Sequence, residues 1–311
     1  MRHFLFFVVV CLFVGEQGLW ADVPHDDTPP VCPDVSEAYA RIPEGEFLAG
    51  SSVLARDIAA QESFQGVLRD QEGRFSHERD FGPQDTGFFE IAHHLVTQKE
   101  YSRFVKSTGH RAPFITETAW IQQGFLVHPY SVVEMYLWRG SRNPRSLNDH
   151  PVVLVSREDA LAYADWLGLK TGCRYRLPTS LEWERAARGE DGRSYPWGTF
   201  WEPKKSNSGG REGGTTEVGS FSLGESPYGL LNMAGNVFEW TADDYQRHSS
   251  VSEETTPIEG VLKGCSWDDL PGYCRAAYWH ARLPSSRHIL IGFRLVRELP
   301  SLSTATPEPT E

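Results

Sequence analysis

The sequence lacks several features that would direct its function. Basic residues are in the minority, with 30 Lys and Arg against 42 Asp and Glu, and the formal net charge is −12. No stretch of the chain gathers the basic residues that attract nucleic acid or anionic lipid, so neither is expected as a partner. No unit recurs at a fixed period, which leaves no sign of a repeat architecture.

Long apolar runs are also missing. The run from Phe4 to Val14 is shorter than the roughly 20 residues that a membrane-spanning helix requires. Arg2 and His3 precede this run and Leu19-Trp20-Ala21 follows it, which is the layout of a cleavable secretory signal. We therefore expect residues 1–21 to be a signal peptide and the protein to be exported, periplasmic or secreted, with no membrane insertion after cleavage.

Cysteines are few. The chain has five, and four of them lie outside the expected signal: Cys32, Cys173, Cys265 and Cys274. Disulfides persist in exported proteins, so these thiols are expected to be able to pair. Four thiols allow three full pairings, and the sequence does not choose among them.

Glycine and proline, by contrast, are plentiful at 28 and 20 residues, beside ten Trp. This composition is typical of a compact domain rich in loops and not of a helical bundle. Prolines among acids in residues 22–40, and the lack of apolar periodicity in residues 300–311, predict disordered flanks. No linker-like stretch interrupts the interval between them, so we expect one domain over residues 41–299.

Three helix starts carry the same signal, a Ser or Thr cap followed three residues later by an acid that can bond back to it. The pairs are Thr97 with Glu100, Ser156 with Asp159, and Thr179 with Glu182. Glycines suited to ending these helices follow at Gly109, at Gly168 or Gly172, and at Gly189.

Strand signals are short and scattered. They fall at residues 45–49, 88–91, 152–155, 261–262 and 289–296. Together with the three helices they predict a mixed α+β domain with little regular secondary structure.

Several motifs follow one another in a fixed order. They are Ile42-Pro43-Glu44-Gly45, His150-Pro151-Val152-Val153, Arg176-Leu177-Pro178-Thr179, Tyr195-Pro196-Trp197-Gly198, Gly235-Asn236-Val237-Phe238-Glu239-Trp240, Gly264-Cys265-Ser266-Trp267 and Gly292-Phe293-Arg294. In content and order this series resembles the formylglycine-generating enzyme, or sulfatase-modifying factor, family over nearly all of residues 41–297. The resemblance implies that family's fold, a variant of the C-type-lectin architecture.

The resemblance implies the family's activity less directly. Formylglycine-generating enzymes oxidise a sulfatase cysteine with copper(I) held by two thiolates, and soft thiolates are the ligands that copper(I) prefers. Counted from the Gly-Cys-Ser-Trp turn, the first thiolate position holds Asp269 and the second holds Cys274. A carboxylate is a hard ligand that does not replace a thiolate, so formylglycine generation is not expected.

Cys265 leaves two readings open, because it replaces the second glycine of the family's Gly-Gly-Ser-Trp turn. It is either part of a structural disulfide or, with Cys274, a relocated metal or redox pair. Copper or iron therefore stays a hypothesis as a redox cofactor. The site residues that the resemblance implies are Ser266, Asp269 and Cys274 as catalytic candidates, with Asp269 as acid or base, and Trp267, Trp240 and Arg282 as substrate-binding residues.

A calcium site is also implied by the resemblance. The family binds calcium through Asn and Glu side chains and two backbone carbonyls, and the matching positions are Asn232, Glu239, Gly235 and Val237. Hard oxygen donors of this mixed origin suit calcium. The alternative is a hydrogen-bonded turn that holds no metal.

Three functions remain open. The first is an oxidative tailoring or maturation enzyme acting on a peptide or small molecule, as the family's pyoverdine-maturation protein and ergothioneine sulfoxide synthases act without formylglycine chemistry. The second is a non-catalytic binding or accessory module, and the third is formylglycine generation through Cys265 and Cys274. Residues 114–145 form an aromatic, insertion-like stretch that is expected to shape a pocket or a partner surface.

Overall fold

The computed structural model describes residues 32, 37–64, 73–123, 128–246 and 257–298. The expected signal peptide, nearly all of the expected N-terminal flank and the tail after residue 298 lie outside these residues. Among the described residues, no helix is both long and apolar enough to cross a membrane.

Short helices and single turns of 3-10 helix are spread along the chain. The α-helices are α1 (Val53–Ser63), α2 (Gln98–Thr108), α3 (Glu117–Gln122), α4 (Tyr130–Val133), α5 (Arg157–Thr171) and α6 (Ser180–Arg188). The 3-10 turns are η1 (Glu134–Tyr136), η2 (Arg145–Leu147), η3 (Pro203–Lys205), η4 (Ser222–Gly224) and η5 (Pro271–Cys274).

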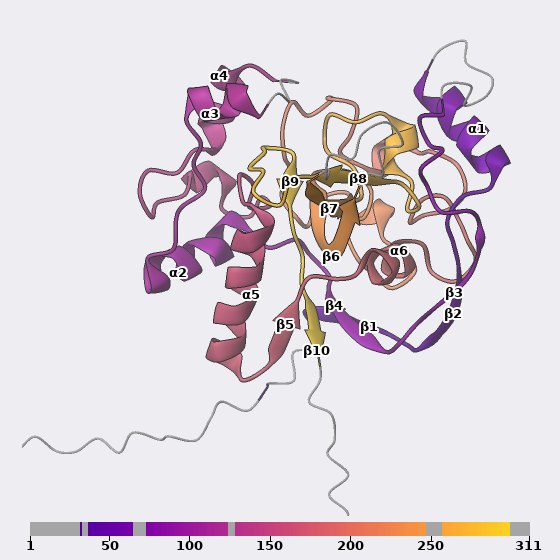
Figure 1. Cartoon of the computed structure of the whole chain (residues 1–311), viewed down its shortest axis with the longest axis horizontal. Coiled ribbons are helices and arrows are strands. Elements are labelled where there is room, and N and C mark those ends of the chain that lie inside the picture. Colours follow the sequence, from indigo (N-terminus) through magenta and orange to yellow (C-terminus); the bar gives the residue numbers. More distant parts are fainter. Residues whose placement is uncertain (1–31, 33–36, 65–72, 124–127, 247–256, 299–311) are drawn as a thin grey trace, which may run out of the picture.

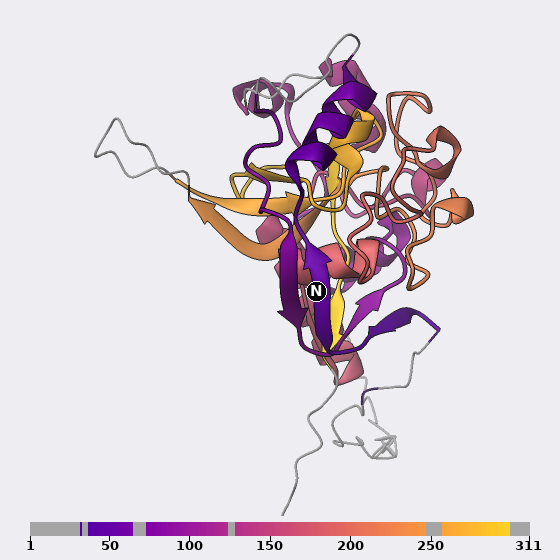
Figure 2. The same cartoon turned by 90° about the vertical axis from the view of Figure 1, so that its right-hand side faces the viewer.

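The strands form three small sheets. They are β1 (Tyr39–Ile42), β2 (Gly45–Ala49), β3 (Gly82–Thr86), β4 (Phe89–Ala92), β5 (Arg174–Arg176), β6 (Phe238–Gln246), β7 (Ile258–Lys263), β8 (Trp279–Arg282), β9 (Ile291–Gly292) and β10 (Val296–Glu298). One sheet has the order β1-β4-β10-β5, a second has β8-β7-β6-β9, and β2 pairs with β3. Helix α5 lies beside β5 and β10, and α6 contacts β2, β3, β6 and β7 (Figure 1). The β6-β7 pair projects from the body of the domain, as Figure 2 shows from the side. The predicted α+β class is confirmed.

All three predicted helix starts are confirmed. Thr97, Ser156 and Thr179 each accept a hydrogen bond from the backbone N–H of the acid three residues later, and each acid bonds back to the cap. The helices end at Gly109, Gly172 and Gly189, whose φ values of 71°, 71° and 72° disfavour a residue with a Cβ.

The predicted strands at 45–49, 88–91 and 261–262 correspond to β2, β4 and part of β7. The single strand predicted over 289–296 is instead two strands, β9 and β10, which belong to different sheets. Gly292, in β9, lies against another loop, where a Cβ would come within 2.8 Å of the Val152 carbonyl oxygen. The C-terminal segment therefore ties the two larger sheets together.

The strand predicted at 152–155 is wrong. All four residues are fully buried, but they form a loop. Leu154 has a φ of 59°, which breaks an extended strand. Its backbone N–H bonds to the His288 carbonyl, and that of Val152 bonds to the Val96 carbonyl, 3.1 and 2.9 Å away. An apolar run can thus be buried with its backbone satisfied by neighbouring loops in place of a strand ladder.

Order begins slightly earlier than predicted. Strand β1 starts at Tyr39, which pairs with Ala92, so the end of the expected flank belongs to a sheet. Cys32 is bonded to Cys173, which follows the end of α5. The other disulfide joins Cys265 to Cys274, and this pairing is one of the three that the sequence left open.

An ion pair between Glu239 and Arg294 lies at the centre of the domain. Both side chains are fully buried, and the guanidinium donates to both carboxylate oxygens at 2.7 and 2.8 Å. The remaining Arg294 hydrogens bond to the carbonyls of Ala92, His93 and Leu231. One residue therefore joins strand β6 to the end of β4 and to two loop carbonyls.

We predict that Glu239→Gln lowers the free energy of unfolding by about 3 to 5 kcal/mol, because it leaves a buried guanidinium without its counter-charge. Urea unfolding in EGTA measures the difference without any contribution from divalent ions. The matched control is Asp80→Asn, since the Asp80 side chain is 98% exposed in its pair with Arg56 and its loss should change stability little. Equal effects of the two substitutions would show that the buried pair is not a main stabilising contact.

Candidate functional site

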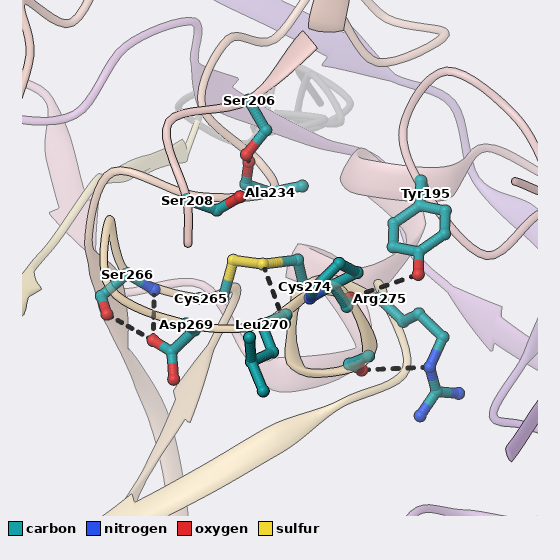
Figure 3. Close-up of a disulfide and its surroundings, with 12 residues drawn as sticks. Tyr195, Ser206, Ser208, Ala234, Cys265, Ser266, Asp269, Leu270, Cys274 and Arg275 are labelled. Atoms are coloured by element: carbon teal, nitrogen blue, oxygen red, sulfur yellow. Dashed lines mark hydrogen bonds between the residues drawn. A yellow bond between two sulfur atoms is a disulfide. The ribbon is translucent and has the colours of Figure 1, made fainter. Parts of the chain in front are cut away.

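The candidate site is formed by the loop that follows β7. Gly264 begins this loop with a φ of 75°, and a Cβ there would lie 3.2 Å from the Trp183 ring. The loop then passes through Ser266 and Asp269 and closes in η5, which ends at Cys274. The predicted catalytic candidates therefore lie in one short segment, as Figure 3 shows.

The disulfide between Cys265 and Cys274 closes this loop at its base. Both cysteines are fully buried, and their Cα atoms are 4.8 Å apart. Cys274 Sγ also lies 3.7 Å from the Leu270 carbonyl oxygen. Cys265 and Cys274 are therefore paired with each other, as the structural-disulfide alternative expected, and neither sulfur is a free thiolate in this state.

Asp269 is the carboxyl of this loop that is hydrogen-bonded to Ser266. Its carboxylate accepts hydrogen bonds from the backbone N–H of Ser266, at 2.8 Å, and from the Ser266 hydroxyl. Burial raises the pKa of Asp269 to about 6, although the two bonds from Ser266 act in the opposite direction. Ser266 is itself fully buried and commits its hydroxyl to this carboxylate, so the two side chains form one hydrogen-bonded pair.

Trp267 is covered by the insertion-like stretch. It is 3% exposed, and the His128 ring stacks on it with ring centroids 4.6 Å apart. His128 Nε2 lies 3.2 Å from a carboxylate oxygen of Asp268. The stretch around residues 114–145 thus reaches the candidate site through His128, and Trp267 contacts protein where a substrate surface was expected.

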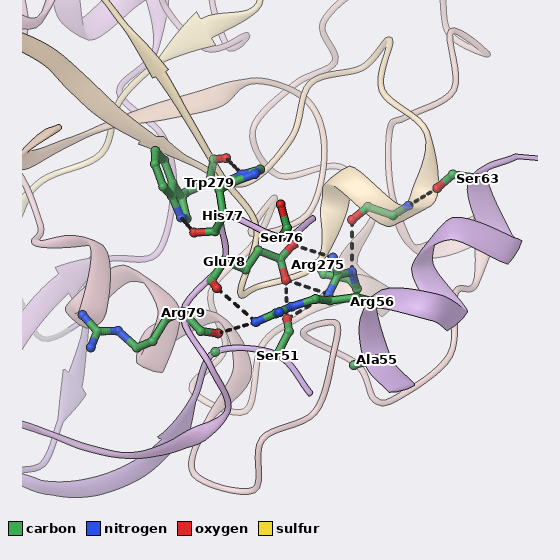
Figure 4. Close-up of polar contacts among 12 residues, drawn as sticks. Ser51, Ala55, Arg56, Ser63, Ser76, His77, Glu78, Arg79, Arg275 and Trp279 are labelled. Carbon is green, nitrogen blue, oxygen red and sulfur yellow. Dashed lines mark hydrogen bonds and ion pairs between the residues drawn. The ribbon is translucent and has the colours of Figure 1, made fainter. Parts of the chain in front are cut away.

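A buried network holds η5 in place. The Arg275 guanidinium donates to both carboxylate oxygens of Glu78 and to the Ser51 hydroxyl, and Ser51 also donates to Glu78. Arg56, from α1, donates to the Glu78 carbonyl at 3.0 Å. Figure 4 shows these contacts converging from segments far apart in the sequence. The disulfide segment is therefore clamped from the side opposite Asp269.

Close packing adds to this clamp. At Gly272 a Cβ would lie 2.5 Å from the Ser63 hydroxyl and 2.7 Å from the Ala59 carbonyl oxygen, so helix α1 leaves room for glycine alone. The Gly272 N–H donates to the Ser63 hydroxyl at 2.7 Å. On the other side, the Tyr195 hydroxyl donates to the Glu62 carboxylate of α1 at 2.6 Å, and its oxygen lies 3.2 Å from the Pro271 carbonyl oxygen.

Two predicted substrate-binding residues have different outcomes. Trp240 is fully buried in β6, and its indole N–H donates to the Val155 carbonyl at 3.1 Å, so its assignment to a substrate pocket is wrong. A tryptophan beside a family motif looks the same in sequence whether it faces the core or a cleft. Arg282, in β8, is partly exposed and lies close enough to Asp269 for its charge to favour the ionised carboxylate.

Two of the four predicted calcium ligands, Asn232 and Glu239, lie near Arg294. Its Nη2 donates at 2.8 Å to both the Leu231 carbonyl and a Glu239 carboxylate oxygen, which brings Glu239 next to the turn at Asn232. Asn232 has a φ of 59°, and its side-chain oxygen is buried with no hydrogen-bond partner among the described residues. An orphaned buried oxygen of this kind fits a cation ligand.

Several residues around the site gave no signal in the sequence. His128, Glu78 and Arg275 belong to no spacing pattern, and they meet Trp267 or η5 only because distant loops fold together. Glu78 and Arg275 are 197 residues apart. The one sequence signal for this packing was the aromatic character of residues 114–145, which predicted that the stretch shapes a pocket or a partner surface.

The fold and the loop at Ser266–Cys274 define a domain of the formylglycine-generating-enzyme type. The chain matches the family model described as "Sulfatase-modifying factor enzyme 1-like domain" over residues 29–299. It therefore belongs to this family, as the sequence motifs indicated.

Relatives with curated names include enzymes. The formylglycine-generating enzyme of Bos taurus is 32% identical over 64% of this chain and 63% of its own length, and that of Thermomonospora curvata is 32% identical over 66% and 80%. Hercynine oxygenase of Mycolicibacterium smegmatis is 28% identical over 85% and 62%. The chain spans less than two thirds of the length of the cattle and mouse enzymes.

Among solved structures, PvdO from Pseudomonas aeruginosa is similar with a TM-score of 0.63 and 26% identity, over 84% of this chain and 94% of that one. CarF is similar with a TM-score of 0.54 and 21% identity, over 84% and 98% of the two chains, which supports the fold alone. The chain thus has the family fold, and its relatives include oxidative enzymes.

We predict that Asp269→Asn raises stability relative to the unchanged protein as pH increases. A carboxyl whose folded pKa lies near 6, above about 4 when unfolded, favours folding below pH 4 and loses this contribution as pH rises through 6. The Asn variant does not titrate, so its free energy of unfolding should gain about 2 kcal/mol on the unchanged protein between pH 4 and pH 7. Urea unfolding at several pH values measures this gain.

Ser266→Ala serves as the matched variant for this test. It removes one of the two bonds that stabilise the ionised carboxylate, so the pH midpoint of the stability change should move above 6. A stability difference between Asp269→Asn and the unchanged protein that does not vary with pH would contradict the assigned pKa.

Proposed function

We propose that this chain is an exported maturation or tailoring enzyme that acts on a peptide or small molecule without forming formylglycine. The observation that carries the proposal is Asp269, a proton-transfer group with a pKa near 6 at the position of a family thiolate. An acid or base works best when its pKa lies near the working pH. The coupled Ser266 hydroxyl and the nearby Arg282 would orient this carboxylate and the anionic form of a substrate.

Copper does not fit this site. Linear copper(I) needs two thiolates, whereas the loop supplies one carboxylate and two sulfurs bonded to each other. Iron fits no better among the described residues, where no three His, Cys, Asp or Glu side chains group as a metal site. No step is therefore assigned to either metal, and formylglycine generation through Cys265 and Cys274 loses its chemical basis.

The proposed export is supported by the two disulfides, which persist in oxidising compartments, and by the signal-like first 21 residues. A second function, a non-catalytic binding or accessory module, is favoured by a different observation. Ser266, Cys265 and Cys274 are all fully buried, so a substrate reaches only the outer edge of Asp269. The partner of such a module would be a peptide or small molecule held beside this loop.

We predict that deleting the gene in its source organism removes one exported product and leaves its unprocessed precursor, which differs from the product in mass. Mass spectrometry of exported peptides and small molecules compares the two strains. Complementation with the unchanged gene should restore the product, and Asp269→Asn should restore less than a tenth of it because its amide cannot exchange the proton. Asp80→Asn is the control and should restore it fully.

Each outcome separates the two functions. Full restoration by Asp269→Asn would contradict the catalytic role of Asp269 and favour the binding module. An unchanged product profile on deletion, with the protein present in the parent strain, would contradict the enzyme proposal itself.

We also propose that calcium binds at Asn232 and Glu239, with the carbonyls of Gly235 and Val237. Arg294 occupies one acceptor site on each Glu239 oxygen, and a carboxylate oxygen has a further lone pair for a cation. Calcium here would stiffen the turn that leads into β6, and no chemical step depends on it.

Calcium at one hundred times its Kd should raise the free energy of unfolding by about 2.7 kcal/mol relative to EGTA. Asn232→Ala should lose most of this gain, because its oxygen is the ligand with no other partner. Asn143→Ala, which lies outside the turn, is the matched control. A calcium gain of the same size in Asn232→Ala as in the control would rule this site out.

A further inference from the structure

A cavity of about 860 Å³ lies beneath the start of the insertion-like stretch. Its described lining comes from segments far apart in the chain: residues 111–123, residues 138–140, and the loop at 285–287. None of these residues belongs to the loop of Ser266 and Asp269. The volume is typical of pockets that bind small organic molecules.

The lining combines apolar walls with positive charge. Phe114, Ile115 and Trp138 provide the apolar part, and Phe114 remains 49% exposed. Arg111, Arg139 and Arg287 provide three guanidinium groups, and no acidic side chain is among the described lining residues.

The charge of these arginines is only partly balanced. Arg287 and Arg111 both donate to Asp159, which is 1% exposed, and His110 contacts the same carboxylate at 2.9 Å. Burial acts to raise the pKa of Asp159, but the Arg287 charge together with the hydrogen bonds from Arg111, Ser156 and His110 outweighs burial, so the net shift is downward and the carboxylate stays ionised. The single negative charge of Asp159 therefore neutralises only part of the charge of Arg111 and Arg287.

Arg139 adds a third cation at the mouth of the cavity. Its side chain is exposed, and among the described residues it has no hydrogen bond or ion pair. Its backbone is fixed by two hydrogen bonds with Arg142, at 3.1 and 3.2 Å. The backbone that carries this guanidinium is thus fixed, and the guanidinium donors are available to a ligand.

We propose that this cavity binds an organic monoanion, with a carboxylate or sulfonate headgroup between Arg139 and Arg111 and an aromatic body against Phe114, Ile115 and Trp138. The planar fork of a guanidinium matches either headgroup through paired hydrogen bonds. The apolar walls favour a ring system over inorganic phosphate or a sugar. This binding site is separate from the site proposed for Asp269 and does not depend on it.

The probe for this site is 1-anilinonaphthalene-8-sulfonate, whose fluorescence increases in an apolar pocket. Its neutral twin, N-phenyl-1-naphthylamine, has the same rings without the sulfonate. We expect the sulfonate to bind at least tenfold more tightly than the twin. Arg139→Ala should weaken sulfonate binding about tenfold, as expected for the loss of one charge-assisted contact, and should leave binding of the neutral twin unchanged.

Arg142→Ala is the matched control. Arg142 lies on the same loop and carries the same charge, but its side chain lines the neighbouring hollows beside Asn143 and not this cavity. The affinity of the Arg142→Ala variant for the sulfonate should stay within twofold of that of the unchanged protein. Equal weakening by Arg139→Ala and Arg142→Ala would reduce the effect to general surface charge and overturn the proposal, as would equal affinity for the two probes.

Competition identifies the headgroup. Added 2-naphthoate should displace the bound sulfonate, whereas 2-naphthalenemethanol, with no charge, should not. Displacement by the alcohol at similar concentrations would show an apolar site without anion recognition and would contradict the proposal. Circular dichroism of each variant confirms that it is folded before binding is measured.

Discussion

The buried ion pair between Glu239 and Arg294 shows the interaction on which this domain depends. A fold with short helices and small sheets leaves many loop carbonyls inside the protein, and each one needs a donor. Arginine has five donors in a rigid fork, so it can bond to a carboxylate and several carbonyls at once. Arg188 repeats this arrangement, since it donates to Glu184 and to the carbonyls of Gly50, Gly192 and Arg193.

A buried arginine also holds the backbone of the candidate site. Arg275 binds Glu78 and the Gly272 carbonyl, and so fixes the backbone of η5 whatever happens at the sulfurs. On the open side of the loop, Asp269 is partly buried and has no guanidinium hydrogen-bonded to it among the described residues. The contrast explains why its pKa rises, while Asp159, which two arginines contact, has a lowered pKa. The site is thus a rigid loop that carries one poised carboxylate.

Local signals in the sequence predicted local structure well. The capping pairs, such as Thr97 with Glu100, act over a single turn, and all three were confirmed. Val152 was predicted in a strand and Trp240 in a substrate pocket, but one lies in a buried loop and the other in the core, because loop, core and pocket positions leave the same apolar pattern in the sequence. Family motifs placed Ser266, Asp269 and Cys274 together, whereas the clamp on η5 and the cavity at Arg139 arise from tertiary contacts that no spacing encodes.

We infer that a Cys265–Cys274 disulfide and the carboxylate of Asp269 stand where formylglycine-generating enzymes hold two thiolates. Peptide mapping of the native protein by mass spectrometry tests it most directly, after alkylation without reduction and digestion between the two cysteines. The account predicts a disulfide-linked peptide pair containing Cys265 and Cys274, with neither residue alkylated. Stoichiometric alkylation of both, together with copper in the same preparation, would contradict it.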